Sequence, residues 1–167
     1  MKIFLALAVL AAVFLGGAYL LFWGSDPARS WVPASAPGIS YQYPESLGTD
    51  YVSAVEWPPL VEKVVNEYSC STGAAAVDGP ATEISERVIS GRTYCVSVSS
   101  EGAAGSTYRT YEYSADLGDM VVRAQFTLRY PQCANYDEPQ QAACREGQES
   151  VDPDQLADGI VSTIAAE

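Results

Sequence analysis

The chain begins with an apolar run, residues 3–23, in which no position carries a charge. A helix of about 20 such residues spans the roughly 30 Å hydrocarbon core of a bilayer. Tyr19 and Trp23 lie at the far end of the run, where amphipathic rings favour the headgroup layer. We therefore predict that residues 1–23 form an uncleaved signal anchor, a single transmembrane helix.

Two alternatives to this anchor remain open, a cleaved signal peptide and a buried core helix. The apolar region of a signal peptide usually has only about 7–15 residues. The sequence 34–36 (Ala-Ser-Ala) resembles a cleavage site, but Pro37 follows it directly. Lys2 precedes the run, so the positive-inside rule places the N-terminus in the cytoplasm and exports the chain from Gly24 onward. We expect a single-pass protein of the cell membrane with an extracytoplasmic C-terminal domain.

Four cysteines follow the apolar run, and none is part of a CxxC pair. A zinc ribbon or a thioredoxin-type motif is therefore not indicated. An even number of cysteines favours disulfides in an oxidising compartment, although four reduced thiols in a cytosolic protein are the alternative. Of the three possible connectivities we predict the two short ones, Cys70–Cys95 and Cys133–Cys144. Each closure is expected to contribute about 3 kcal/mol through the unfolded state.

The exported part is predicted to consist of a proline-rich tether, residues 24–38, and one α+β domain, residues 39–167. Alternating polar and apolar residues favour strands at 39–43, 51–57, 83–89, 92–99, 107–114 and 120–130. Ser90-Gly91 and the segment 115–119 join consecutive strands as hairpin turns. The stretch 60–68 fits either a helix or a strand, and 71–82 and 101–106 are expected to be loops.

The last predicted element is a helix that begins at Asp152. Asp152 is the expected N-cap, with Pro153 in the first turn. Leu156, Ile160 and Ile164 repeat every four residues, so one apolar stripe should pack on the inner face of the sheet. The fold class is therefore α+β, an antiparallel meander packed by a C-terminal helix.

The composition excludes several kinds of chemistry. The chain has no histidine, which removes the Ser-His-Asp and Cys-His mechanisms and every His-ligated metal site. Its formal net charge of −12 argues against nucleic-acid binding. The acidic clusters at 137–138 and 152–158 lack the EF-hand pattern. We predict no catalytic residue, no metal site and no cofactor.

The basic residues are concentrated in the central strands, where they are mixed with tyrosines. Arginine and tyrosine are both enriched at interface hot spots. The alternative is cross-strand ion pairing with Glu86 and Glu112 on a solvated face. The predicted binding face consists of four strand residues and one tyrosine from the 133–144 loop: Arg109, Tyr111, Arg123, Arg129 and Tyr136.

Several short runs also carry a resemblance: 43–46 (Tyr-Pro-Glu-Ser), 56–59 (Glu-Trp-Pro-Pro), 90–96, 100–108 and 128–139. Together they resemble a group of uncharacterised exported or membrane-anchored bacterial proteins. The order of elements is also similar to the PsbP/Mog1-type α+β fold. Neither resemblance implies an activity.

These observations favour a binding or structural module of the cell envelope, with the membrane and an envelope protein or glycan as partners. The alternative is a cell-surface hydrolase that uses carboxylate or metal chemistry, which two convergent carboxylates in a deep pocket would support.

Overall fold

The computed structural model describes residues 30–65, 68–75 and 80–167. The helical elements are the 3-10 turn η1 (Cys133–Asn135) and the helices α2 (Gln140–Glu149) and α3 (Pro153–Ser162). The strands are β1 (Trp31–Ala36), β2 (Ile39–Pro44), β3 (Ser53–Ala54), β4 (Leu60–Val64), β5 (Gly73–Ala75), β6 (Ala81–Ile89), β7 (Arg92–Ala103), β8 (Ser106–Asp116), β9 (Val121–Pro131) and β10 (Ala165–Ala166).

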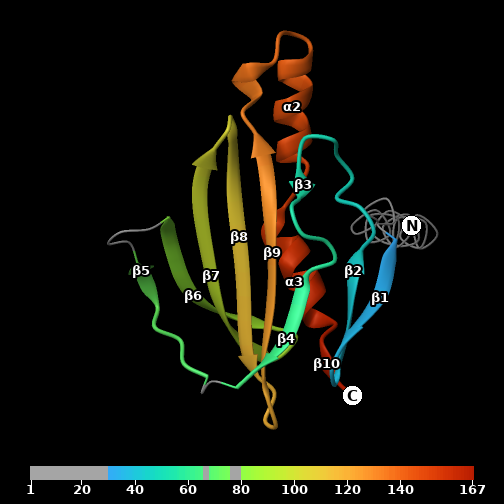
Figure 1. Cartoon of the computed structure of the whole chain (residues 1–167), viewed down its shortest axis with the longest axis vertical. Coiled ribbons are helices and arrows are strands. Elements are labelled where there is room, and N and C mark those ends of the chain that lie inside the picture. Colours follow the sequence, from blue (N-terminus) through green and yellow to red (C-terminus); the bar gives the residue numbers. More distant parts are fainter. Residues whose placement is uncertain (1–29, 66–67, 76–79) are drawn as a thin grey trace, which may run out of the picture.

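A seven-stranded antiparallel sheet forms most of the molecule (Figure 1). Its strands lie in the order β3-β9-β8-β7-β6-β5, and β4 also pairs with β9. The strands β6 to β9 follow one another as a meander, which confirms the predicted antiparallel hairpins. A smaller sheet, β1-β2-β10, lies on the other side of α3 from β9. The α+β class is confirmed.

The inner face of the large sheet carries the hydrophobic core. Alternate residues of β9 are buried there, as the period-two pattern predicts: Val122, Ala124, Phe126 and Leu128 are all at most 2% exposed. Helix α3 covers this face with the predicted stripe, because Leu156, Ala157, Ile160 and Val161 are buried. The side chain of Asp152 caps α3 by accepting hydrogen bonds from two first-turn amides.

Trp31 of β1 packs on α3 at Gly159, on the side of the helix away from its buried stripe. A β-carbon at Gly159 would lie 2.8 Å from the Trp31 ring, so the glycine gives the indole room. β1 is also paired along its whole length with β2. The predicted tether is therefore corrected: residues 31–36 belong to the folded domain, which begins before residue 39. Short polar and proline-containing sequences do not by themselves distinguish an edge strand from a linker.

The structure decides one segment that the sequence left open and changes the prediction for three others. The stretch 60–68, which fitted either a helix or a strand, forms a strand at 60–64, where β4 pairs with β9. The predicted strand 51–57 shortens to β3, two residues. The expected loop 101–106 is a tight turn, because β7 continues to Ala103 and β8 starts at Ser106. The expected loop 71–82 contains β5 and the first two residues of β6. The loop closed by Cys133–Cys144 is present, and it contains η1 and the start of α2, which were not predicted.

Both predicted disulfides are present, and no cysteine is free. Cys95 lies on the outer face of β7, so Cys70–Cys95 fastens the segment before β5 across that face. Cys133–Cys144 joins η1 to α2 and holds the upper end of the molecule in Figure 1 together. Paired cysteines are typical of an oxidising, extracytoplasmic compartment.

The predicted transmembrane helix, residues 1–23, lies outside the described residues. Within residues 30–65, 68–75 and 80–167, no helix has both the length and the apolarity that a bilayer crossing requires.

Candidate binding groove

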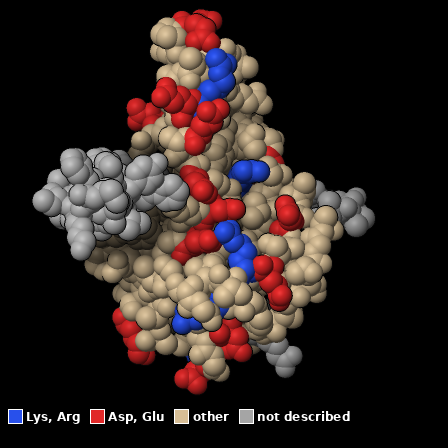
Figure 2. Space-filling model, turned by 180° about the vertical axis from the view of Figure 1, so that it is seen from behind, with Lys and Arg blue, Asp and Glu red and all other residues tan. Residues whose placement is uncertain are grey.

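Part of the inner face of the large sheet borders a groove of about 320 Å³ beside the start of α3. We call it the inner-face groove. Three neighbouring strands form its floor, and the first turn of α3 forms one wall. Figure 2 shows acidic and basic side chains gathered over the middle of the face that carries α3. The groove is lined by Glu83, Ser85, Arg87, Val96, Val98, Arg109, Tyr111, Asp152, Pro153 and Asp154.

The register of the strands explains why these residues share one face. Ser90-Gly91 forms a two-residue turn, so Ile89 pairs with Arg92 and every second residue of β6 faces inward with Tyr94, Val96 and Val98. Glu83, Ser85 and Arg87 of β6 therefore lie on the core side of the sheet, beyond the part that α3 covers.

Arg87 is the first of two cations in the groove, and it is neutralised by α3. Its guanidinium lies 2.8 Å from Asp158 Oδ2 and 3.4 Å from Asp154 Oδ1, and it also donates to the Tyr113 hydroxyl at 3.3 Å. Burial raises the pKa of Tyr113 far above its ordinary value. Burial also raises the pKa of Asp158, against the opposing effect of Arg87. This network joins β6 and β8 to α3 and is mainly structural.

Arg109 is the second cation, and it differs from Arg87. It is exposed, and no carboxylate of the described residues lies within ion-pair distance of it. Burial raises the pKa of the neighbouring Tyr111, while the charge of Arg109 acts in the opposite direction. Glu83, on the other side of Val98, is likewise exposed and forms no ion pair with the residues that the structure describes. The groove thus offers Arg109 and Glu83, two opposite charges without an ion-pair partner in the described part of the chain, beside an apolar strip.

The predicted binding face does not exist as one surface. Arg109 and Tyr111 lie on the inner face, where Tyr111 is only 2% exposed and stacks on Phe126. Arg123 and Arg129 lie on the outer face. Tyr136 is elsewhere, edge-on against Tyr51 at a ring-centroid distance of 5.9 Å. The strands place consecutive residues on opposite faces, which separates Arg129 from Leu128 and hence from Arg109.

The outer face matches the alternative interpretation, cross-strand ion pairing, in part: Glu112 takes part, whereas Glu86 forms no ion pair with the described residues. Arg123 of β9 forms ion pairs with Glu62 of β4 and Glu112 of β8. Arg129 donates a hydrogen bond to Ser106 Oγ at 3.1 Å. Arg123 and Arg129 are thus engaged with their neighbours and do not form a free cluster.

The carboxylates near the groove have structural partners. Asp152 accepts from backbone amides, and Asp154 and Asp158 face Arg87. Among the described residues no group of three or more acidic or cysteine side chains is arranged to hold a metal ion.

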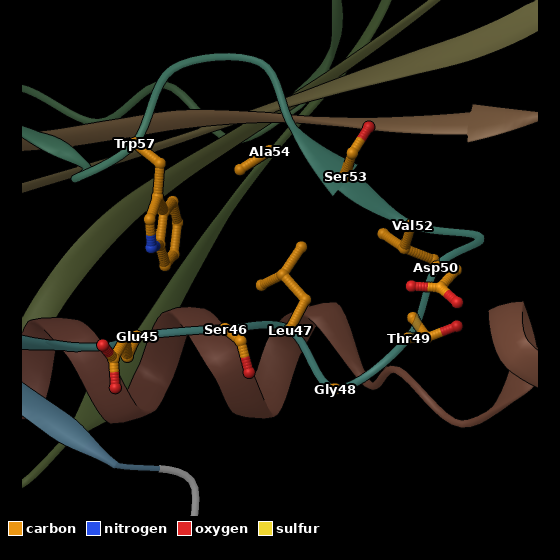
Figure 3. A pocket seen from close by; sticks show the side chains of 10 residues that line it. All are labelled: Glu45, Ser46, Leu47, Gly48, Thr49, Asp50, Val52, Ser53, Ala54 and Trp57. Atoms are coloured by element: carbon orange, nitrogen blue, oxygen red, sulfur yellow. The ribbon is translucent and has the colours of Figure 1, made fainter.

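A second hollow, of about 490 Å³, lies between residues 45–49 and 52–57 (Figure 3). Leu47, Val52 and Trp57 point into it, whereas the Glu45 side chain points away. The Trp57 indole already donates to the Pro44 carbonyl at 3.0 Å. Asp50 also lines this hollow, but none of its lining residues is basic, and the inner-face groove, which has both charges, is the stronger candidate.

Two residues that line the inner-face groove, Arg109 and Tyr111, were among the candidates predicted from sequence. Three other lining residues, Glu83, Arg87 and Asp154, were not. The hairpin turn at 90–91 was predicted, but the register that it sets was not followed back along β6. Counting back from it in steps of two places Arg87, Ser85 and Glu83 on the face of Tyr94, and polar residues at inward positions mark the edge of a core.

Comparison with known proteins identified no matching family model, no similar curated protein and no similar solved structure. The resemblance to the PsbP/Mog1-type fold is thus untested and stays a prediction.

Proposed function

We propose that the chain is a membrane-anchored binding domain of the cell envelope, and that it recognises an envelope partner through the inner-face groove. The observation that carries the proposal is the exposed Arg109, which has no counter-ion among the described residues, in a chain with a formal net charge of −12. An unpaired arginine beside buried tyrosine and valine side chains is typical of a recognition site. The two disulfides support an extracytoplasmic position.

Attachment to the membrane follows from the sequence of residues 3–23 and is part of the proposal. The position of β1 supports retention of the N-terminal segment. Cleavage after Ala36 would remove all of β1, which pairs with β2 from Trp31 to Ala36 and places Trp31 against α3. An uncleaved chain keeps this strand.

The hydrolase alternative is less well supported. Glycoside hydrolysis by two carboxylates needs both of them free to face the substrate. In the groove Asp152 caps a helix and Asp154 faces Arg87, which leaves Glu83 as the only lining carboxylate without such a partner.

A photo-cross-linking amino acid at Ser100 tests the proposal, because Ser100 lies on the inner face opposite Arg109. The adjacent Ser99 lies on the outer face and is the matched control. We expect the full chain in its native membranes to form an adduct from position 100 and none from position 99. No adduct at position 100, or equal adducts at both positions, would refute recognition through the groove.

A further inference from the structure

The chemistry of the inner-face groove identifies a class of ligand, and this inference rests on the proposed function. A hollow of about 520 Å³ continues the groove toward β5 and shares Glu83, Val98 and Arg109 with it. The two hollows are thus joined at the three residues that provide a negative charge, an apolar contact and a positive charge. An extended ligand can cross the sheet at this point.

The register gives the spacing of the two charges. Glu83 pairs with Val98, and Val98 pairs with Tyr111, so these three residues form one row across the strands. Arg109 lies two residues from Tyr111 along β8. With strands about 4.8 Å apart and about 3.4 Å per residue, the α-carbons of Glu83 and Arg109 are about 12 Å apart. Both side chains leave the same face of the sheet, and at this spacing they lie side by side without meeting each other.

The guanidinium of Arg109, which has no counter-ion among the residues described, favours a carboxylate, because charge-assisted hydrogen bonds are stronger than neutral ones. Val98 and the buried Val96 and Tyr111 favour an apolar group next to that carboxylate. Glu83 favours a cation a short distance further along. We infer that the groove captures the C-terminus of a partner polypeptide. The terminal carboxylate binds Arg109, the apolar side chain of the last residue packs on Val98, and a basic side chain one residue earlier binds Glu83.

This ligand also fits the charge of the whole chain. Residues 39–83 contain seven acidic residues and one basic residue, and residues 131–167 contain eight and one. Such a domain attracts basic peptides and repels acidic ones. Arg109 provides local attraction for the one negative group that every unmodified peptide carries at its end. Capture of a terminal carboxylate is an established mode of peptide recognition.

Equilibrium dialysis of radiolabelled N-acetyl-lysyl-leucine against the full chain in non-ionic detergent tests the inference. Empty micelles correct for partition into detergent. We expect the free acid to bind about three- to fivefold more tightly than the dipeptide amide, as expected for a carboxylate paired with an exposed guanidinium. N-acetyl-glutaminyl-leucine, which lacks the cation, should bind about threefold more weakly than the lysyl peptide, as expected for an exposed ion pair.

Three variants assign the contacts. Arg109→Gln should abolish the preference for the acid over the amide, and Glu83→Gln should abolish the preference for lysine over glutamine. Arg129→Gln, on the outer face, is the matched control and should change neither preference. Equal binding of acid and amide to the unmodified chain would overturn the inference, and so would free leucine binding as tightly as the dipeptide. If the Ser100 adduct forms while no dipeptide binds, the proposed function stands and this inference fails.

Discussion

Tyr94→Phe removes a single buried oxygen that links the sheet to α3. Tyr94 is 1% exposed, and its hydroxyl donates to the Val161 carbonyl at 2.9 Å while accepting from Arg92 Nη1 at 3.3 Å. A buried carbonyl left without a partner costs about 1–3 kcal/mol. The Val161 carbonyl retains the amide of Ile164 at 3.3 Å. We therefore expect a loss of about 1–2 kcal/mol in the free energy of unfolding.

The same substitution at Tyr130 is predicted to have a different outcome. The Tyr130 hydroxyl is buried without a hydrogen-bond partner among the described residues. Burial raises its pKa, as does interaction with Tyr111. Its removal leaves no group unpaired and ends the cost of desolvating the hydroxyl. Tyr130→Phe should leave the stability unchanged or raise it by up to about 1 kcal/mol.

Urea unfolding of the oxidised full chain, followed by tryptophan fluorescence, measures both effects. Tyr108→Phe, on the outer face, is the control and should have little effect. A change in the midpoint with a constant slope shows that stability itself has changed. Equal losses from Tyr94→Phe and Tyr130→Phe would refute the reasoning, because the effect would then depend on the ring and not on the hydroxyl's partners.

Three further changes test other contacts. Asp152→Ala removes the cap of α3, whose carboxylate accepts from the amides of Asp154 and Gln155 at 3.0 Å, and should cost about 0.5–2 kcal/mol with faster hydrogen exchange in the first turn. Gly147→Ala places a methyl group 2.6 Å from Thr49 Oγ1 and 2.9 Å from the Tyr51 ring, so urea unfolding should show a loss of about 1–3 kcal/mol. Because burial raises the pKa of Asp158, the folded state holds that proton more tightly than the unfolded chain. This contribution to the free energy of unfolding is present below the ordinary aspartate pKa of about 3.9 and is lost as pH rises through the raised pKa. Urea unfolding between pH 3 and 6 should therefore show a decrease in stability with pH. Asp158→Asn should remove the part of this decrease that Asp158 causes.

The short-range features of the fold were accessible from sequence because each depends on neighbouring residues. The alternation in 120–130 identified the buried face of β9, and Ser90-Gly91 identified the turn between β6 and β7. Asp152 and Pro153 marked the start of α3 for the same reason, since capping involves only the first turn of a helix.

The candidate site was only partly predictable. Arg109 and Tyr111 were identified as binding residues, but Arg123 and Arg129 were grouped with them although they lie on the opposite face. That error came from composition, which records which residues a strand contains and not the direction in which each points. The missing neighbours, Glu83 and Asp154, are 71 positions apart in the chain, and only the packing of α3 against β6 brings their elements to one groove.

Sequence alone therefore determined the hairpins, the start of the last helix and the two short cysteine pairings, all of which depend on a few adjacent residues or a short loop. Tertiary structure decided that residues 31–36 are a strand, that 60–64 pair with β9, and that part of the inner face stays open. The physical reason is that strand pairing and surface coverage are set by partners distant in the chain, whose contribution no local pattern contains.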